Sequence, residues 1–195
     1  MIDVLLFPED DGLEKFVGRL AARMAREHGV PMRLRVRGGR GFGGVLKELE
    51  GFHRVWKRGG ERLPDALIVA VDANCRGIEE RLKAIDATAP ELSGRIVHAI
   101  ADPHIERWML LDGSAFKAVV GKGCNAPDLK CAKDRYKKLL AEAVVECGVR
   151  PLLGGIEYAE ELADAMNLMR AARQDSGIRR FLSEWQTLLK RQARS

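Results

Sequence analysis

The first half of the chain alternates short apolar runs with longer segments whose apolar residues recur at helical spacing. The runs predict strands at residues 2–7, 31–37, 66–71 and 95–101. Helical spacing predicts helices at residues 13–27, 45–57 and 78–86, and a further helix, with Asp102 as its N-cap, that runs to about Leu111. Strands and helices that alternate in this way are typical of βαβ units. We therefore expect an α/β, Rossmann-like fold with a mostly parallel sheet of about four strands flanked by helices.

The second half of the chain predicts helices alone, at residues 127–147, 156–173 and 177–193. We expect two parts, an α/β domain at residues 1–125 and a helical C-terminal extension at residues 126–195 that packs on it. One apolar stripe marks the last helix, formed by Phe181, Leu182, Trp185, Leu188 and Leu189. We interpret the stripe as core or a subunit contact, because no apolar run reaches the ~20 residues that cross a bilayer.

The predicted strand at residues 31–37 carries arginine at every second position. Arg33, Arg35 and Arg37 therefore share one face, and apolar residues share the other. This pattern favours an edge strand with a solvated, basic face. The arginines either keep the edge soluble or contact an anion such as nucleic acid.

A glycine-rich segment, residues 38–44, joins this strand to the next helix and contains Arg40. A turn of this kind can hold phosphate on exposed backbone N–H groups. The glycines can equally serve only to turn the chain tightly. The segment lacks the GKS or GKT ending of a nucleotide-binding P-loop, which argues against that motif.

Composition adds modest constraints. The 195 residues are 46% hydrophobic and carry a formal net charge of +5, with a pI of about 9.2, so nucleic acid is a permitted partner. The N-terminus has neither a basic segment nor a small-residue cleavage site, and we expect a cytoplasmic protein with no membrane partner. The four cysteines, which form no CxxC pair, are expected to be reduced thiols: Cys75, Cys124, Cys131 and Cys147.

Acidic side chains follow three of the predicted strands. Glu9 follows the first, Asp72 the third, and Asp102 with Glu106 the fourth. In parallel sheets, ligands bind beyond the carboxyl ends of the strands, and Mg²⁺ prefers oxygen ligands. The predicted ligands of Mg²⁺ (or Mn²⁺) are Glu9, Asp72, Asn74 and Asp102. The alternative is that these residues only cap helices and form turns.

The order of these motifs resembles the Toprim (topoisomerase–primase) domain. The residues PEDDGLEKF, GGRGFGG, VAVDANC and HIERW, within residues 2–112, are similar to small stand-alone Toprim-like proteins related to the overcoming-lysogenisation-defect nucleases. The resemblance implies catalytic roles for Glu9 (or the adjacent Asp10), Asp72 and Glu106. Asn74 stands where that family usually has a second Asp, which weakens the expected metal site. Trp108, in the Glu-x-Trp helix, is expected to pack in the core.

The resemblance implies a Mg²⁺-dependent nuclease, with a role in anti-phage defence. Phosphate contacts are expected from Arg33, Arg35, Arg37, Arg40, Lys117, Lys122, Lys130 and Lys133. His104 is expected either to donate a proton to a leaving oxygen or to fill a polar position at a helix start. Two alternatives stay open. One is a catalytically weak scaffold that acts with a partner ATPase or as a homo-oligomer, using the Trp185 stripe as a docking face. The other is a nucleotide-binding α/β protein.

Overall fold

The computed structural model describes residues 1–124, 131–132 and 134–193. It contains one four-stranded sheet in the order β2-β1-β3-β4, and every neighbouring pair is parallel. The strands are β1 (Ile2–Pro8), β2 (Met32–Val36), β3 (Ala66–Asp72) and β4 (Ile96–Ala101). The predicted α/β class and the four predicted strands are therefore confirmed.

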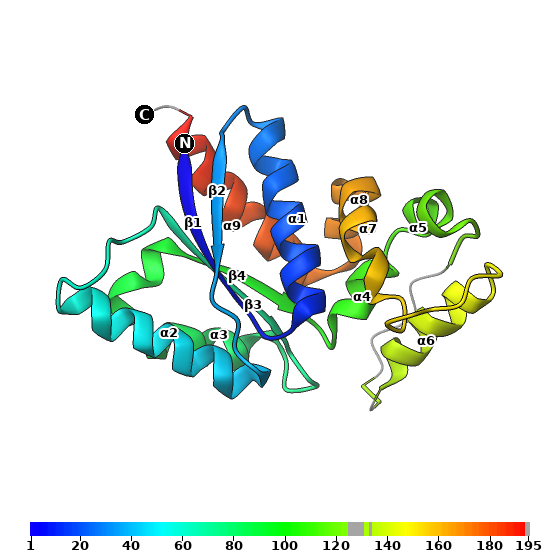
Figure 1. Ribbon diagram of the computed structural model, residues 1–195, viewed down its shortest axis with the longest axis horizontal. Coiled ribbons are helices and arrows are strands. Elements are labelled where there is room, and N and C mark those ends of the chain that lie inside the picture. The colour runs from blue at the N-terminus through cyan, green and yellow to red at the C-terminus, as the bar shows by residue number, and fades with distance from the viewer. Residues whose placement is uncertain (125–130, 133, 194–195) are drawn as a thin grey trace.

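Helices cover both faces of the sheet and extend beyond one end of it (Figure 1). The α-helices are α1 (Asp11–Glu27), α2 (Gly41–Lys57), α3 (Ile78–Thr88), α4 (Ile105–Met109), α5 (Gly113–Val120), α6 (Arg135–Val145), α7 (Ala159–Ala165), α8 (Leu168–Gln174) and α9 (Ser176–Gln192). Two short 3-10 helices, η1 (Pro90–Arg95) and η2 (Ile156–Tyr158), complete the described elements.

Alternate residues of each central strand feed two separate hydrophobic clusters. In β1, Val4 and Leu6 pack with α1 and α9, whereas Leu5 and Phe7 pack with α2 and α3. The central strands are buried on both faces, which is why they appear in the sequence as continuous apolar runs. The first cluster also includes residues of α6, α7 and α8, so the C-terminal helices share a core with the sheet.

The helical half departs from the sequence prediction in three places. The helix expected at 127–147 begins at Arg135, and its expected first turns lie largely outside the described residues. The helix expected at 156–173 is divided, because Met166 is extended and Asn167 starts α8 by accepting a hydrogen bond from the Arg170 N–H at 3.0 Å. The sequence pattern did not predict α5.

Two of the four cysteines are bonded to each other. Cys75 and Cys131 form a disulfide with a Cα–Cα distance of 5.7 Å, while Cys124 and Cys147 are free. The prediction of four reduced thiols is therefore wrong for one pair. The partners are 56 residues apart in sequence, and only the fold brings the turn after β3 beside the segment before α6.

The apolar stripe of α9 is buried inside the chain. Phe181, Trp185 and Leu189 have no exposed surface, and the Trp185 indole N–H donates to the carbonyl of Ala21 in α1 at 3.1 Å. The interpretation as core is confirmed, and the interpretation of the Trp185 stripe as a docking face is wrong. None of the helices in the described ranges is long and apolar enough to cross a membrane.

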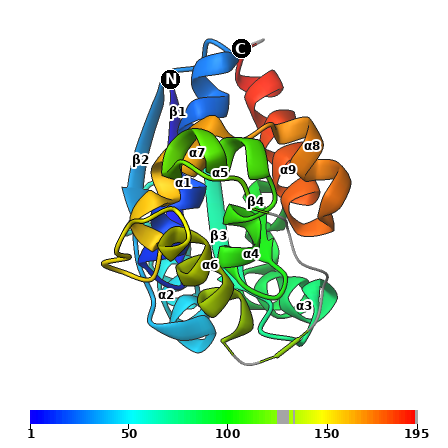
Figure 2. The ribbon, with the colours of Figure 1, turned by 90° about the vertical axis from the view of Figure 1, so that its right-hand side faces the viewer.

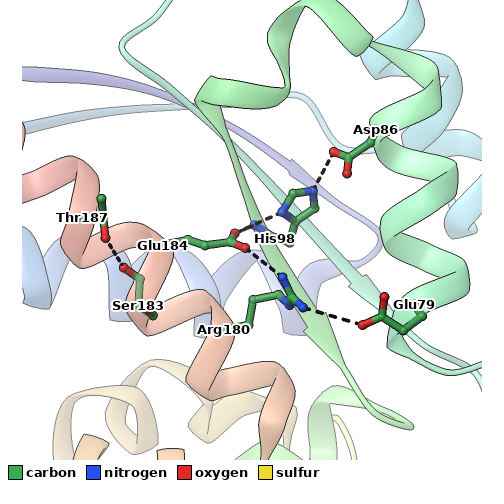
Figure 3. A network of polar contacts seen from close by, with 7 residues as sticks. All are labelled: Glu79, Asp86, His98, Arg180, Ser183, Glu184 and Thr187. Carbon is green, nitrogen blue, oxygen red and sulfur yellow. Dashed lines mark hydrogen bonds and ion pairs between the residues drawn. The ribbon is translucent and has the colours of Figure 1, made fainter.

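A buried histidine attaches α9 to the edge strand β4 (Figure 3). His98 lies 3.0 Å from Glu184 of α9 and 3.1 Å from Asp86 of α3 through its two ring nitrogens, and its backbone N–H donates to Glu184 at 2.8 Å. Burial alone would lower the pKa of His98, but the two carboxylates outweigh burial and raise that pKa. The imidazolium form is therefore favoured in the folded protein, because both ring nitrogens have acceptors.

We predict that Glu184→Ala lowers the free energy of unfolding by about 2 kcal/mol at pH 6, since charged hydrogen bonds to His98 are lost. A histidine pKa that is raised by folding stabilises below its ordinary value, and this contribution disappears as the pH rises through the folded value. The cost of the substitution should therefore be smaller at pH 8.5. Urea unfolding at both pH values measures this.

The matched control is Gln186→Ala on the same helix, where the side chain is exposed and no contact is expected to be lost. An equal loss of stability at pH 6 and pH 8.5 in Glu184→Ala would contradict the role given to the imidazolium.

Candidate functional site

The strand order of the sheet reverses between β1 and β3. From β1 the chain crosses outward to β2, and it then returns to place β3 and β4 on the other side of β1. Such a switch point opens a crevice at the carboxyl ends of the two central strands. Glu9 follows β1 there, and one of its carboxylate oxygens accepts a hydrogen bond from the Asp72 backbone N–H at 3.1 Å.

Asp72 connects the end of β3 to the start of α4. Its Oδ1 accepts a hydrogen bond from the Ile105 N–H at 2.9 Å, and its Oδ2 lies 3.0 Å from His104 Nδ1. The predicted N-cap, Asp102, is therefore wrong. His104 occupies the N-cap position without a side-chain cap, and Asp72, distant in sequence, satisfies the helix N–H instead.

A buried aspartate on the far side of α4 fixes the orientation of that short helix. Asp175 accepts hydrogen bonds from the Trp108 indole at 3.0 Å and from the Ile178 N–H at 2.9 Å, and it pairs with Arg107. Trp108 is fully buried, as predicted. Glu106, between these anchored residues, lines the cleft at the strand ends.

The cleft at the strand ends has a volume of about 820 Å³. Its walls come from the turn after β1, the glycine-rich segment, α4 and the C-terminal helices, and α4 and α6 lie beyond the strand ends in Figures 1 and 2. The charged side chains that line it are Glu9, Asp10, Asp11, Glu14, Arg40, Glu106 and Lys137. Gly39 is required where the glycine-rich segment enters, because a Cβ there would collide with the backbone of Gly44 and Val45.

The carboxylates at the strand ends hold their protons more tightly than isolated carboxylates do. Burial raises the pKa of Asp72 to about 6, against the lowering effect of His104, and the charges of Asp10 and Glu9 add to the increase. Burial likewise raises the pKa of Glu9, although the Asp72 N–H opposes it. The pKa of Glu106 is also raised, first by burial and then by the charge of Asp72.

His104 completes the cluster as a basic group. Its hydrogen bond to Asp72 raises its pKa, partly offset by burial, and the charges of Asp72 and Glu106 raise it further. The raised pKa favours the imidazolium form of His104 in its contact with Asp72. This arrangement leaves a proton donor beside the acidic groups.

Two of the predicted metal ligands, Asn74 and Asp102, do not line this cleft. β3 ends at Asp72, and Asn74 follows in a left-handed conformation (φ 49°) with an exposed side chain, so the strand alternation that would align Asn74 with Asp72 is lost. Asp102 lines a second cleft, together with Arg76 and Arg179. Burial and the charge of Asp175 raise the pKa of Asp102.

The predicted phosphate-contacting residues are dispersed. Arg40 lines the acidic cleft, Arg33 is exposed, and Lys117 lines another hollow beside α5. The other described residues of this set are held in ion pairs, Arg35 with Asp3, Arg37 with Glu61 and Lys122 with Glu146. Lys130 and Lys133 lie outside the described residues.

Three further charged residues, Asp10, Lys137 and Arg81, belong to the site. Asp10 caps α1 through the Leu13 N–H at 2.9 Å and still lines the cleft, whereas Glu9 contacts Asp72. Lys137 of α6 reaches the cleft, and its charge lowers the pKa of Glu106 against the effect of burial. Arg81 of α3 lowers the pKa of Glu9 in the same way. The sequence offered Asp10 as the alternative to Glu9 and placed Lys137 in a basic run suited to phosphate, but no sequence signal marked Arg81.

The residues at the strand ends fit a hard cation in chemistry. Glu106 is 5% exposed, and its Oε2 has no hydrogen-bond partner among the described residues. Glu9, Asp72 and Glu106 offer oxygen ligands, and a cation would favour their ionised forms, which burial above all and neighbouring acidic charges disfavour. Across the described ranges, no group of three or more His, Cys, Asp or Glu side chains is already spaced as a metal site.

A scan against protein-family models and searches of curated proteins and of solved structures found no match to the chain.

A second buried aspartate shows what a purely structural carboxylate looks like in this fold. Asp112 caps α5 and also accepts the Asn167 N–H at 2.8 Å. Burial alone would raise the pKa of Asp112, but these backbone donors and Arg170 lower it. Asp72 and Asp112 are thus both buried, with pKa shifts of opposite sign.

We predict that Asp72→Asn raises the free energy of unfolding at pH 8 by about 1 to 3 kcal/mol. A carboxyl whose pKa is raised by folding, here from 3.8 to about 6, destabilises the folded state when ionised, and this cost is complete above the folded value. Asparagine can still accept the Ile105 N–H and can donate to a neutral His104. Thermal or urea unfolding at pH 8 measures the change.

Asp112→Asn is the matched control and should lower stability by about 1 to 3 kcal/mol, because the amide has one oxygen where the carboxylate used two. A loss of stability in both variants would show that Asp72 is a structural carboxylate.

Proposed function

We propose that this protein is a divalent-cation-dependent hydrolase of nucleic acid phosphodiesters, in which Glu9, Asp72 and Glu106 would hold Mg²⁺ or Mn²⁺. The observation that supports the proposal is that the buried Asp72 and Glu106 and the half-buried Glu9 all have raised pKa values at the switch point of the sheet, where the charge of Asp72 acts on Glu106 and that of Glu9 acts on Asp72. Groups with perturbed pKa values in a cleft are typical of functional sites. They lower stability when ionised, which favours a role other than folding.

The neighbouring side chains have roles that suit phosphate ester hydrolysis. A bound divalent cation supplies polarisation of the phosphoryl group and activation of water. Lys137 and Arg40, which line the cleft, would contact phosphate oxygens. His104, held by Asp72 and with a raised pKa, would donate a proton to the leaving oxygen.

A weakly catalytic version of the same site, acting with a partner ATPase, is the second candidate. The observation that favours it is the exposed position of Asn74, which adds no charge to the cluster. A site with fewer carboxylates binds Mg²⁺ less tightly, since ligand charge sets much of the affinity. This candidate differs from the first in predicting cation binding without cleavage by the isolated chain.

We predict that the wild-type protein cleaves fluorescently labelled oligonucleotides with Mg²⁺ or Mn²⁺ and not with EDTA. Glu106→Gln should reduce the rate by roughly 100-fold or more, because it removes a charged oxygen from the cluster while keeping its size. Single-stranded and double-stranded DNA and RNA are assayed in parallel. Glu48→Gln, at an exposed carboxylate on α2, is the matched control and should retain wild-type activity.

Isothermal titration with Mn²⁺ separates the two candidates. Cation binding that Glu106→Gln weakens, without cleavage of any substrate, would favour the scaffold. Cleavage that proceeds in EDTA, or at an equal rate in Glu106→Gln, would be incompatible with the proposed hydrolase.

A further inference from the structure

Arg81 of α3 is a buried cation without a partner among the described residues. It is 6% exposed, its Nε is buried and unbonded, and no hydrogen bond or ion pair to it is found in the described ranges. A buried unpaired charge is costly, and buried guanidinium groups normally meet an anion. A missing anionic partner is therefore the feature to be explained.

The guanidinium of Arg81 lies at the first turn of α2. Its central carbon is 3.9 Å from the ring centroid of Phe42, the second residue of that helix. Stacking on an aromatic ring holds the planar group in place but leaves its edge N–H groups able to bind. Arg81 also lowers the pKa of Glu9, although burial dominates that value, so its charge acts on the acidic cleft.

The anionic group beside the first turn of α2 comes from another segment, because the Phe42 backbone N–H lowers the pKa of Glu9. The N-cap residue, Arg40, makes no side-chain cap, and the first turn contains no acidic residue. Glycines at 41, 43 and 44 leave Phe42 as the one large side chain of that turn, and a Cβ at Gly43 would meet nothing within 4 Å. The N-terminus of a 17-residue helix carries a positive dipole end that favours an anion, and its first N–H, that of Gly41, donates to the Glu9 carbonyl at 3.4 Å.

We propose that Arg81 and the first turn of α2 form a phosphate-binding subsite beside the acidic cleft. A guanidinium edge matches two phosphate oxygens, and helix N–H groups can bind the others. The phosphate is either the 5′-terminal group of a strand or a phosphodiester one or more nucleotides from the scissile bond. The inference rests on the proposed function for its ligand class, but its test needs binding alone.

The test compares two six-nucleotide, 3′-labelled single-stranded DNA probes, one with a 5′-phosphate and one with a 5′-hydroxyl. Fluorescence anisotropy is measured at fixed ionic strength with Ca²⁺ in place of Mg²⁺, so that binding is observed without turnover. Arg81→Met keeps an unbranched, apolar side chain beside Phe42 and removes the guanidinium and its charge. Binding should weaken by roughly tenfold or more, as expected for loss of a charged hydrogen bond to phosphate.

Gly43→Asp provides a second variant that does not disturb the core. An acidic residue in the first turn stabilises a helix, yet here it would repel the phosphate. The charge-matched controls are Arg76→Met, at an exposed arginine before α3, and Gly51→Asp, farther along α2. Both controls should bind within about twofold of the wild type, because surface charges at a distance are largely screened.

Each outcome decides the proposal. Weaker binding of both probes by both test variants identifies an internal phosphodiester, and weaker binding of only the phosphorylated probe identifies a terminal phosphate. Wild-type binding of both probes by Gly43→Asp and by folded Arg81→Met would overturn the subsite, as would failure of the wild type to bind either probe. A wild type that cleaves nucleic acid while both variants bind normally would refute the subsite and leave the proposed hydrolase standing. Binding that both variants weaken, without cleavage by the wild type, would support the subsite and refute the proposed hydrolase.

Discussion

The side chain and backbone of Asp72 connect the three elements on which the candidate site depends. Its backbone N–H donates to Glu9 after β1, its Oδ1 caps α4 through Ile105, and its Oδ2 contacts His104. Because β1 and β3 are neighbours at the switch point, these contacts require no unusual backbone between the strands. Burial is the main cause of the raised pKa of Asp72; the charges of Asp10 and Glu9 add to it, and the contact with His104 opposes it.

The buried carboxylates of the protein fall into two kinds. Asp112 and Asp175 accept several hydrogen bonds and pair with arginine, so burial is compensated within the chain. Glu106 keeps an oxygen that has no hydrogen-bond partner in the part of the chain that the structure describes, and Asp72 lies near other acidic side chains. The first kind holds helices in place, and the second kind is what a site for a cation would require. The unpaired Arg81 is the cationic counterpart of the second kind.

The features that follow from local pattern were predictable from the sequence. β1, β3 and β4 are buried over most of their length, so apolar runs located them, whereas the edge strand β2 was located by the alternation of apolar residues with arginine. The placement of Glu9 and Asp72 at adjacent strand ends followed from parallel topology. Features that depend on which elements pack together were not predictable. The cap of α4 comes from a residue 33 positions earlier, the disulfide joins residues 56 apart, and Arg81 meets Phe42 only because α2 and α3 are neighbours. The position of Asn74 was missed for a local reason, because its left-handed backbone ends the strand alternation.

The central claim is that Glu9, Asp72 and Glu106 together form a cation site. The most direct measurement is anomalous X-ray diffraction from crystals soaked in Mn²⁺ at pH 8. Asp72 is ionised at this pH, because its pKa is about 6. The account predicts an anomalous peak within ligand distance, about 2.0 to 2.4 Å, of oxygens from these three residues. A peak at Asp102 in the second cleft, or no peak near Asp72 at saturating Mn²⁺, would contradict it.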